Sequence, residues 1–92
     1  MPEVLNPLEW EANRSEILYR TLCRKRELET TGGDKVSLLE QDGDKEVFVE
    51  LDKAFVLKGI HRIMFSVWRD MAAVGKKEVA QDIVRNFRAR QE

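Results

Sequence analysis

Residues 35–52 read KVSLLEQDGDKEVFVELD, and this stretch decides the class of fold. Two runs in it, Lys35–Leu39 and Glu46–Leu51, are rich in apolar and β-branched residues, which favour strands. The residues between them include Asp42-Gly43, a dipeptide typical of tight hairpin turns. We therefore predict an antiparallel β-hairpin, with room for both strands to extend toward the turn.

A helix is predicted before the hairpin. Asn6 can cap it and Pro7 suits the first helical position, while Glu9 completes a capping-box pattern. Gly32 and Gly33 follow, and glycine readily adopts the left-handed conformation that ends a helix. The first helix should therefore begin at Pro7 and end just before these glycines.

Two more helices are predicted after the hairpin. Asp52 is a plausible cap for a long helix that runs to about residue 74, although Gly59 weakens its first turns and could delay its start. Gly75 breaks the pattern, and a last helix covers about residues 76–90.

Length and composition fit one small domain. Of the 92 residues, 42% are apolar and 36% are charged, which suits a packed core better than a disordered chain. We expect a single α+β domain over residues 1–92, in the order helix, β-hairpin, long helix, helix, with residues 1–5 and 91–92 as frayed tails. Because an isolated hairpin is marginally stable, it should pack on the helices or pair with another chain.

Charge is distributed unevenly along the chain. Residues 1–33 carry five basic and six acidic side chains, a net charge of −1. Residues 34–52 carry two basic and seven acidic side chains, a net −5, and residues 53–92 carry nine basic and four acidic, a net +5. An acidic hairpin is thus followed by basic helices.

The sequence shows no membrane or export signal. No run approaches the ~20 apolar residues that a bilayer requires, and the first residues lack the basic and apolar regions of a signal peptide. Cys23 is the single cysteine, which excludes an internal disulfide and a multi-cysteine zinc site. We expect a cytoplasmic protein that does not bind membranes.

Residues that could support catalysis are scarce. His61 is the single histidine and lies at the edge of an apolar helix face, and Cys23 lies on an apolar stripe, so both are interpreted as packing residues. The acidic residues 42–46 lack the glycine and glutamate spacing of an EF-hand loop. We therefore expect no catalytic residue, no cofactor and no metal, and we predict that the chain is not an enzyme.

The first helix carries two apolar stripes, although one core needs only one. Leu18 and Leu22 lie on the first stripe, and Trp10, Ile17 and Leu28 form the second. A helix wedged between the hairpin and another helix would use both stripes inside the fold. An exposed second stripe would instead bind a partner. The long helix raises a similar choice, because its apolar arc covers more than half of its circumference.

These features predict a small non-catalytic module for protein–protein interaction. It would act as an adaptor or regulatory subunit and bind another protein or a second copy of itself, with a homodimer as the expected homo-oligomer. The apolar contact is predicted to use Trp10, Ile17 and Leu28. The acidic turn is predicted to steer a basic partner through Asp42, Asp44 and Glu46.

Nucleic-acid binding is the alternative prediction. Basic side chains gather at the end of the first helix and around the last helix, namely Arg20, Arg24, Lys25, Arg26, Lys76, Lys77, Arg85 and Arg88. If the fold brought them together, they could neutralise several phosphates. The sequence pI of about 5.9 and the lack of a known nucleic-acid-binding motif favour an ordinary solvated basic face instead.

Overall fold

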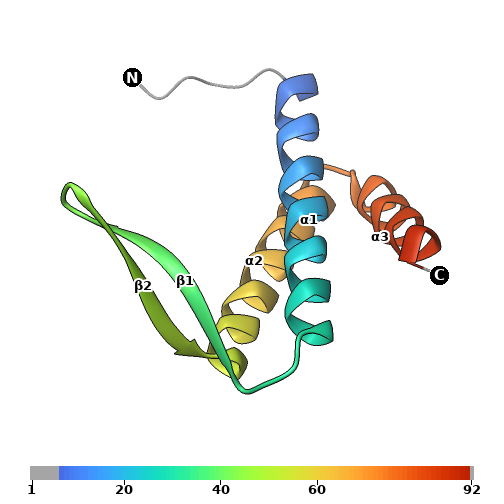
Figure 1. The fold of residues 1–92 in the computed structure, drawn as a ribbon. Coiled ribbons are helices and arrows are strands. Elements are labelled where there is room, and N and C mark those ends of the chain that lie inside the picture. Colours follow the sequence, from blue (N-terminus) through green and yellow to red (C-terminus); the bar gives the residue numbers. More distant parts are fainter. Residues whose placement is uncertain (1–6, 92) are drawn as a thin grey trace.

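The computed structural model describes residues 7–91 and shows three helices and one two-stranded antiparallel sheet (Figure 1). In chain order the elements are α1 (Pro7–Thr30), β1 (Lys35–Asp42), β2 (Lys45–Asp52), α2 (Lys53–Ala73) and α3 (Lys77–Gln91). The predicted α+β fold, in the order helix, hairpin, long helix, helix, is confirmed. The predicted tail at residues 1–5 and residue 92 lie outside the described residues, and Gln91 is the last residue of α3.

The two strands continue up to a two-residue turn. They pair over eight residues each, from Lys35 opposite Asp52 to Asp42 opposite Lys45. Gly43 has a φ of 64°, and tight hairpin turns need a positive φ at this position. The polar residues beside the turn therefore belong to the strands, as the sequence allowed.

Asp52 joins the hairpin to α2, but not as a helix cap. It holds the N-cap position with extended backbone, and its side chain makes no capping hydrogen bond. Its carboxylate accepts a hydrogen bond from Lys35 Nζ on the opposite strand. This hydrogen bond, and then the charge of Asp52, raise the pKa of Lys35 above its usual value of 10.5. The Lys35–Asp52 pair thus closes the base of the hairpin.

A glycine turn separates α2 from α3, as the sequence predicted. Gly75 has a φ of 76°. Its N–H donates to the Ala72 carbonyl at 3.1 Å, and the N–H of Lys76 donates to the Met71 carbonyl at 2.7 Å. These two bonds form a Schellman motif, which ends α2.

The core lies among the three helices and leaves the hairpin outside. Its main cluster of buried residues comes in pairs from α1, α2 and α3, namely Leu18, Leu22, Val67, Met71, Ala80 and Phe87. Leu28 of α1 and Ile60 of α2 are also buried. Helix α1 packs against both α2 and α3, so it is wedged between two helices and not between a helix and the hairpin. The hairpin contacts α2 near its base and otherwise stands away from the helices as an arm (Figure 1).

Candidate functional site

The predicted apolar contact on α1 lies largely inside the fold. Leu28 is only 4% exposed, and Trp10 and Ile17 are half-buried against the core. The guanidinium of Arg14 stands over the Trp10 ring, 5.8 Å from its centroid, and forms an ion pair of 3.7 Å with Asp70 of α2. Since α1 uses both stripes for packing, Leu28 is out of a partner's reach and these residues form no free apolar surface.

Most of the exposed large apolar side chains lie on the hairpin and on α2 instead. Phe48 is 77% exposed and Leu39 is 54% exposed on the hairpin. On α2, Phe55 is 67% and Ile63 is 50% exposed. Single exposed apolar residues are ordinary, but neighbouring ones often mark a binding surface.

Leu39 and Phe48 are neighbours across the two strands. The register places them directly opposite each other, so both side chains stand on the same face of the hairpin. We call them the Leu39–Phe48 pair, and the face that carries them the outer face. The outer face is otherwise polar, with Lys35, Ser37, Gln41, Glu46, Glu50 and Asp52. The inner face carries the half-buried residues Val36, Leu38, Val49 and Leu51.

Phe55 and Ile63 form a second exposed apolar strip. They lie eight residues apart on α2 with Gly59 midway between them, so all three share one flank of the helix. Apart from the two neighbouring residues and the surrounding backbone of α2, no heavy atom lies within 4 Å of the position that a Cβ on Gly59 would take. This flank is therefore open to a partner.

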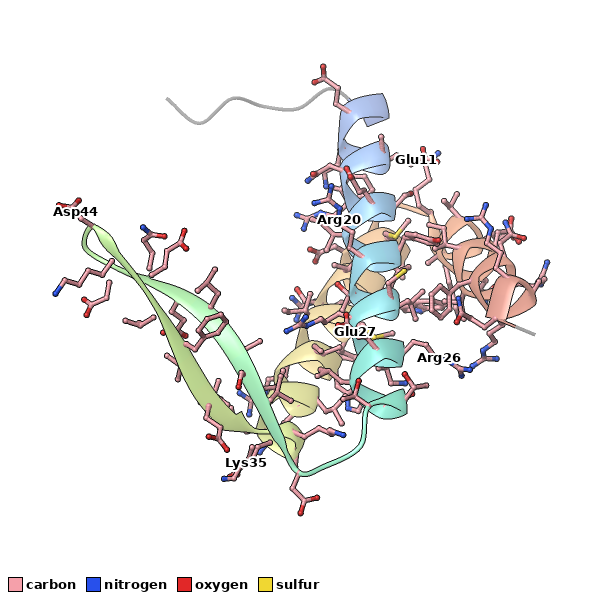
Figure 2. The ribbon with its side chains drawn as sticks, viewed as in Figure 1. Glu11, Arg20, Arg26, Glu27, Lys35 and Asp44 are labelled. Atoms are coloured by element: carbon pink, nitrogen blue, oxygen red, sulfur yellow. The ribbon has the colours of Figure 1, made fainter. Side chains whose placement is uncertain are left out.

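The acidic turn lies at the far end of the arm. Asp42, Asp44 and Glu46 are all exposed, and Asp44 stands at the tip of the hairpin, away from the helices (Figure 2). This position makes their charges accessible to an approaching molecule. Whether they steer a basic partner stays a prediction.

The basic residues of the alternative prediction are divided among several places. Arg20 lies on the side of α1 that faces the arm, whereas Arg26 lies on the side that faces α3 (Figure 2). Several are held by nearby carboxylates: Arg20 by Glu16 at 2.7 Å, Lys76 by Glu11 at 3.2 Å, and Arg85 by Asp82 at 3.2 Å. Arg24 likewise pairs with Glu27 at 3.7 Å, and Lys77 is exposed at the start of α3.

One groove does bring three of the basic residues together. Lys25, Arg26 and Arg88 line a cavity of about 270 Å³ between α1 and α3, with Leu22, Met64 and Phe87 also in its wall. Glu29 lines the same groove and pairs with Lys25 at 3.5 Å. The remaining positive charge is carried by Arg26 and Arg88.

His61 and Cys23 occupy different environments. His61 is exposed on α2, whereas Cys23 is half-buried against the helical core. Within residues 7–91, His, Cys, Asp and Glu side chains form no group of three that could hold a metal ion. No helix in that same range is long and apolar enough to cross a membrane.

The chain exposes more surface than a compact protein of its size. Its solvent-accessible area is 7271 Å², whereas a mass of 10.8 kDa predicts about 5,500 Å². The radius of gyration is 15.6 Å, against about 12 Å expected for a domain of this length. The protruding arm contributes to this open shape (Figure 1).

Comparisons with known proteins assign no family. The chain matches no protein-family model, no curated protein and no solved structure.

Proposed function

We propose that this protein is a small non-catalytic interaction module, an adaptor or regulatory subunit, that self-associates as a homodimer through its hairpin. The observation that carries the proposal is the arm with its exposed Leu39–Phe48 pair. A two-stranded hairpin is marginally stable alone and gains stability from a further strand or a covering partner.

The chemistry of the arm suits a protein partner. Aromatic side chains contribute much of the binding energy in protein interfaces, commonly with a polar rim around them. Phe48 has this setting, because polar residues flank the Leu39–Phe48 pair on the outer face. The acidic turn at the tip would add electrostatic selection between partners.

Sedimentation equilibrium over a range of concentrations tests this function. The wild type is compared with Leu39→Ser and with Phe65→Ser, a control whose exposed apolar side chain lies on α2 instead of the arm. We expect a concentration-dependent dimer whose Kd rises at least about fivefold in Leu39→Ser, because each dimer would bury two Leu39 side chains and about 1 kcal/mol of lost burial corresponds to that factor. Phe65→Ser should leave Kd unchanged. A chain that stays monomeric at every concentration contradicts the proposal, as does an equal effect of both variants.

Nucleic-acid binding is kept as a second candidate because of the groove lined by Lys25, Arg26 and Arg88. A real phosphate interface loses affinity for duplex DNA with a log–log salt slope of about −0.9 per neutralised phosphate. Arg26→Gln and Arg88→Gln should each reduce that slope by about one. Absence of binding to DNA and RNA at low salt would eliminate this candidate.

A further inference from the structure

Among residues 7–91, no other strand covers the second edge of either strand of the hairpin. The turn closes on the pair Asp42–Lys45, which is a hydrogen-bonded pair in a two-residue turn. Such pairs alternate with non-bonded ones along an antiparallel ladder. The backbone N–H and C=O groups of Ser37, Leu39 and Gln41 therefore point away from β2, into the open edge of β1.

The edge of β1 is accessible. Ser37, Leu39 and Gln41 are all exposed, and within residues 7–91 none of them makes a backbone hydrogen bond beyond the hairpin ladder. Unpaired edge groups of this kind are a template for pairing with another chain. The same alternation gives β2 an open edge at Glu46, Phe48 and Glu50.

Acidic side chains disfavour pairing of the β2 edge with the β2 edge of a second copy. A two-fold axis perpendicular to the sheet pairs the strands antiparallel and places residues of the same face opposite each other. With the axis at Phe48, Glu46 lies opposite Glu50 of the second copy. Moving the axis by one residue, to Val47 or to Val49, places Glu50 opposite Asp44 of the second copy or Glu46 opposite Asp52 of the second copy. Each register thus opposes like charges, which destabilises the pairing.

The edge of β1 does not place like charges directly opposite each other in this way. With the two-fold axis at Leu39, Leu39 lies opposite itself and Ser37 lies opposite Gln41 of the second copy. On the inner face, Leu38 lies opposite Glu40 and Val36 lies opposite Asp42. No two like charges lie directly opposite each other in the paired strands, where the two copies of Glu40 are only diagonal neighbours, and two leucines meet at the centre.

We propose that two copies of this chain join edge to edge through β1, about a two-fold axis at Leu39, and form a four-stranded antiparallel sheet in the order β2–β1–β1–β2. This inference rests on the proposed self-association and specifies its geometry. The Leu39–Phe48 pairs of the two copies become one apolar row across four strands. The acidic β2 edges lie on the outside of the sheet, so the assembly closes at two chains and does not grow into a filament.

Disulfide trapping tests the register directly. In a Cys23→Ala background, Leu39→Cys places two thiols at opposed positions whose Cα atoms are about 5.5 Å apart, within the range that a disulfide spans. The matched control is Phe48→Cys on the same face. In the proposed sheet its two copies are three strand spacings apart, about 14 Å. Under mild oxidation we expect at least about tenfold more cross-linked dimer from Leu39→Cys than from Phe48→Cys.

A proline pair tests the edge without new thiols. Gln41→Pro removes an N–H that points out of β1, and Glu50→Pro removes one that points out of β2, so the alternation leaves the bonds between β1 and β2 intact in both. We expect Gln41→Pro to raise the dimer Kd at least about tenfold through two lost hydrogen bonds. Glu50→Pro should leave Kd unchanged.

The outcomes separate this inference from the proposed function. Cross-linking at Leu39→Cys, together with loss of the dimer in Gln41→Pro alone, supports the β1 edge. A dimer that cross-links faster at Phe48→Cys, or at neither position, overturns the β1 edge and leaves self-association standing. A chain that is monomeric by sedimentation at every concentration overturns both.

Discussion

Two leucine-to-alanine substitutions distinguish a core position from an arm position. Leu28 is 4% exposed, whereas Leu39 is 54% exposed. Removing three buried carbons costs about 2.4 kcal/mol in transfer free energy. Because Leu28 is almost fully buried, its substitution loses nearly all of this transfer free energy. The cavity left behind raises the total cost to roughly 3 kcal/mol. Leu39 in the isolated chain is more than half exposed, so its substitution loses less than half of this transfer free energy. No cavity forms, and the cost is about 1 kcal/mol.

Urea unfolding followed by circular dichroism measures both costs. At a concentration where the chain is monomeric, Leu28→Ala should lower the free energy of unfolding by about 2 kcal/mol more than Leu39→Ala does. At high concentration the cost of Leu39→Ala should rise, because the proposed dimer would bury Leu39, while the cost of Leu28→Ala should stay constant. Equal costs at all concentrations would refute the assignment of Leu28 to the core and of Leu39 to the interface.

Three further substitutions test the local structure. Gly59→Ala should stabilise the fold by about 0.5–1 kcal/mol, because it lies inside α2 with open space around the new Cβ. Gly75→Ala should destabilise it by roughly 1–2 kcal/mol, because its φ is 76°; thermal unfolding of the two variants should therefore shift Tm in opposite directions. Asp52 raises the pKa of Lys35, so the stability gained from this pair is complete below the unfolded-state pKa and is lost as pH rises through the folded-state pKa. In Lys35→Gln the free energy of unfolding should therefore fall less between about pH 9 and 12 than it does in the wild type, as measured by urea unfolding. An equal fall in both proteins would contradict this role of the Lys35–Asp52 pair.

The order of elements was predictable because its signals are local. The Asp42-Gly43 dipeptide marks the turn, and Gly75 marks the end of α2, each by a backbone conformation that glycine tolerates. The role of Asp52 was not predictable from its neighbours. Its carboxylate pairs with Lys35, 17 residues earlier, and a cap prediction considers only the residues that follow.

The candidate surface was only partly predictable. Helix periodicity shows that Trp10, Ile17 and Leu28 share a face of α1, but not that other helices cover this face. Alternation does place Phe48 on the face opposite Val47 and Val49. The partnership of Phe48 with Leu39 follows only once the turn is known to contain two residues, because turn length fixes the register. The exposure of both depends on how the arm leaves the helices, a tertiary feature with no local signal.

The charge of the arm makes salt dependence a decisive measurement. Residues 34–52 carry a net charge of −5, so two arms side by side repel each other. The strands would lie within the Debye length of about 10 Å at 0.1 M salt, and added salt should therefore screen the repulsion and lower the dimer Kd. A basic protein partner on the acidic turn, or a phosphate backbone on the groove of α1 and α3, would give the opposite sign, because screening weakens attraction. Sedimentation equilibrium from about 0.05 to 0.5 M salt measures this sign. A dimer that weakens steadily with salt would show that attraction between unlike charges holds it, which the pairing of two β1 edges does not provide.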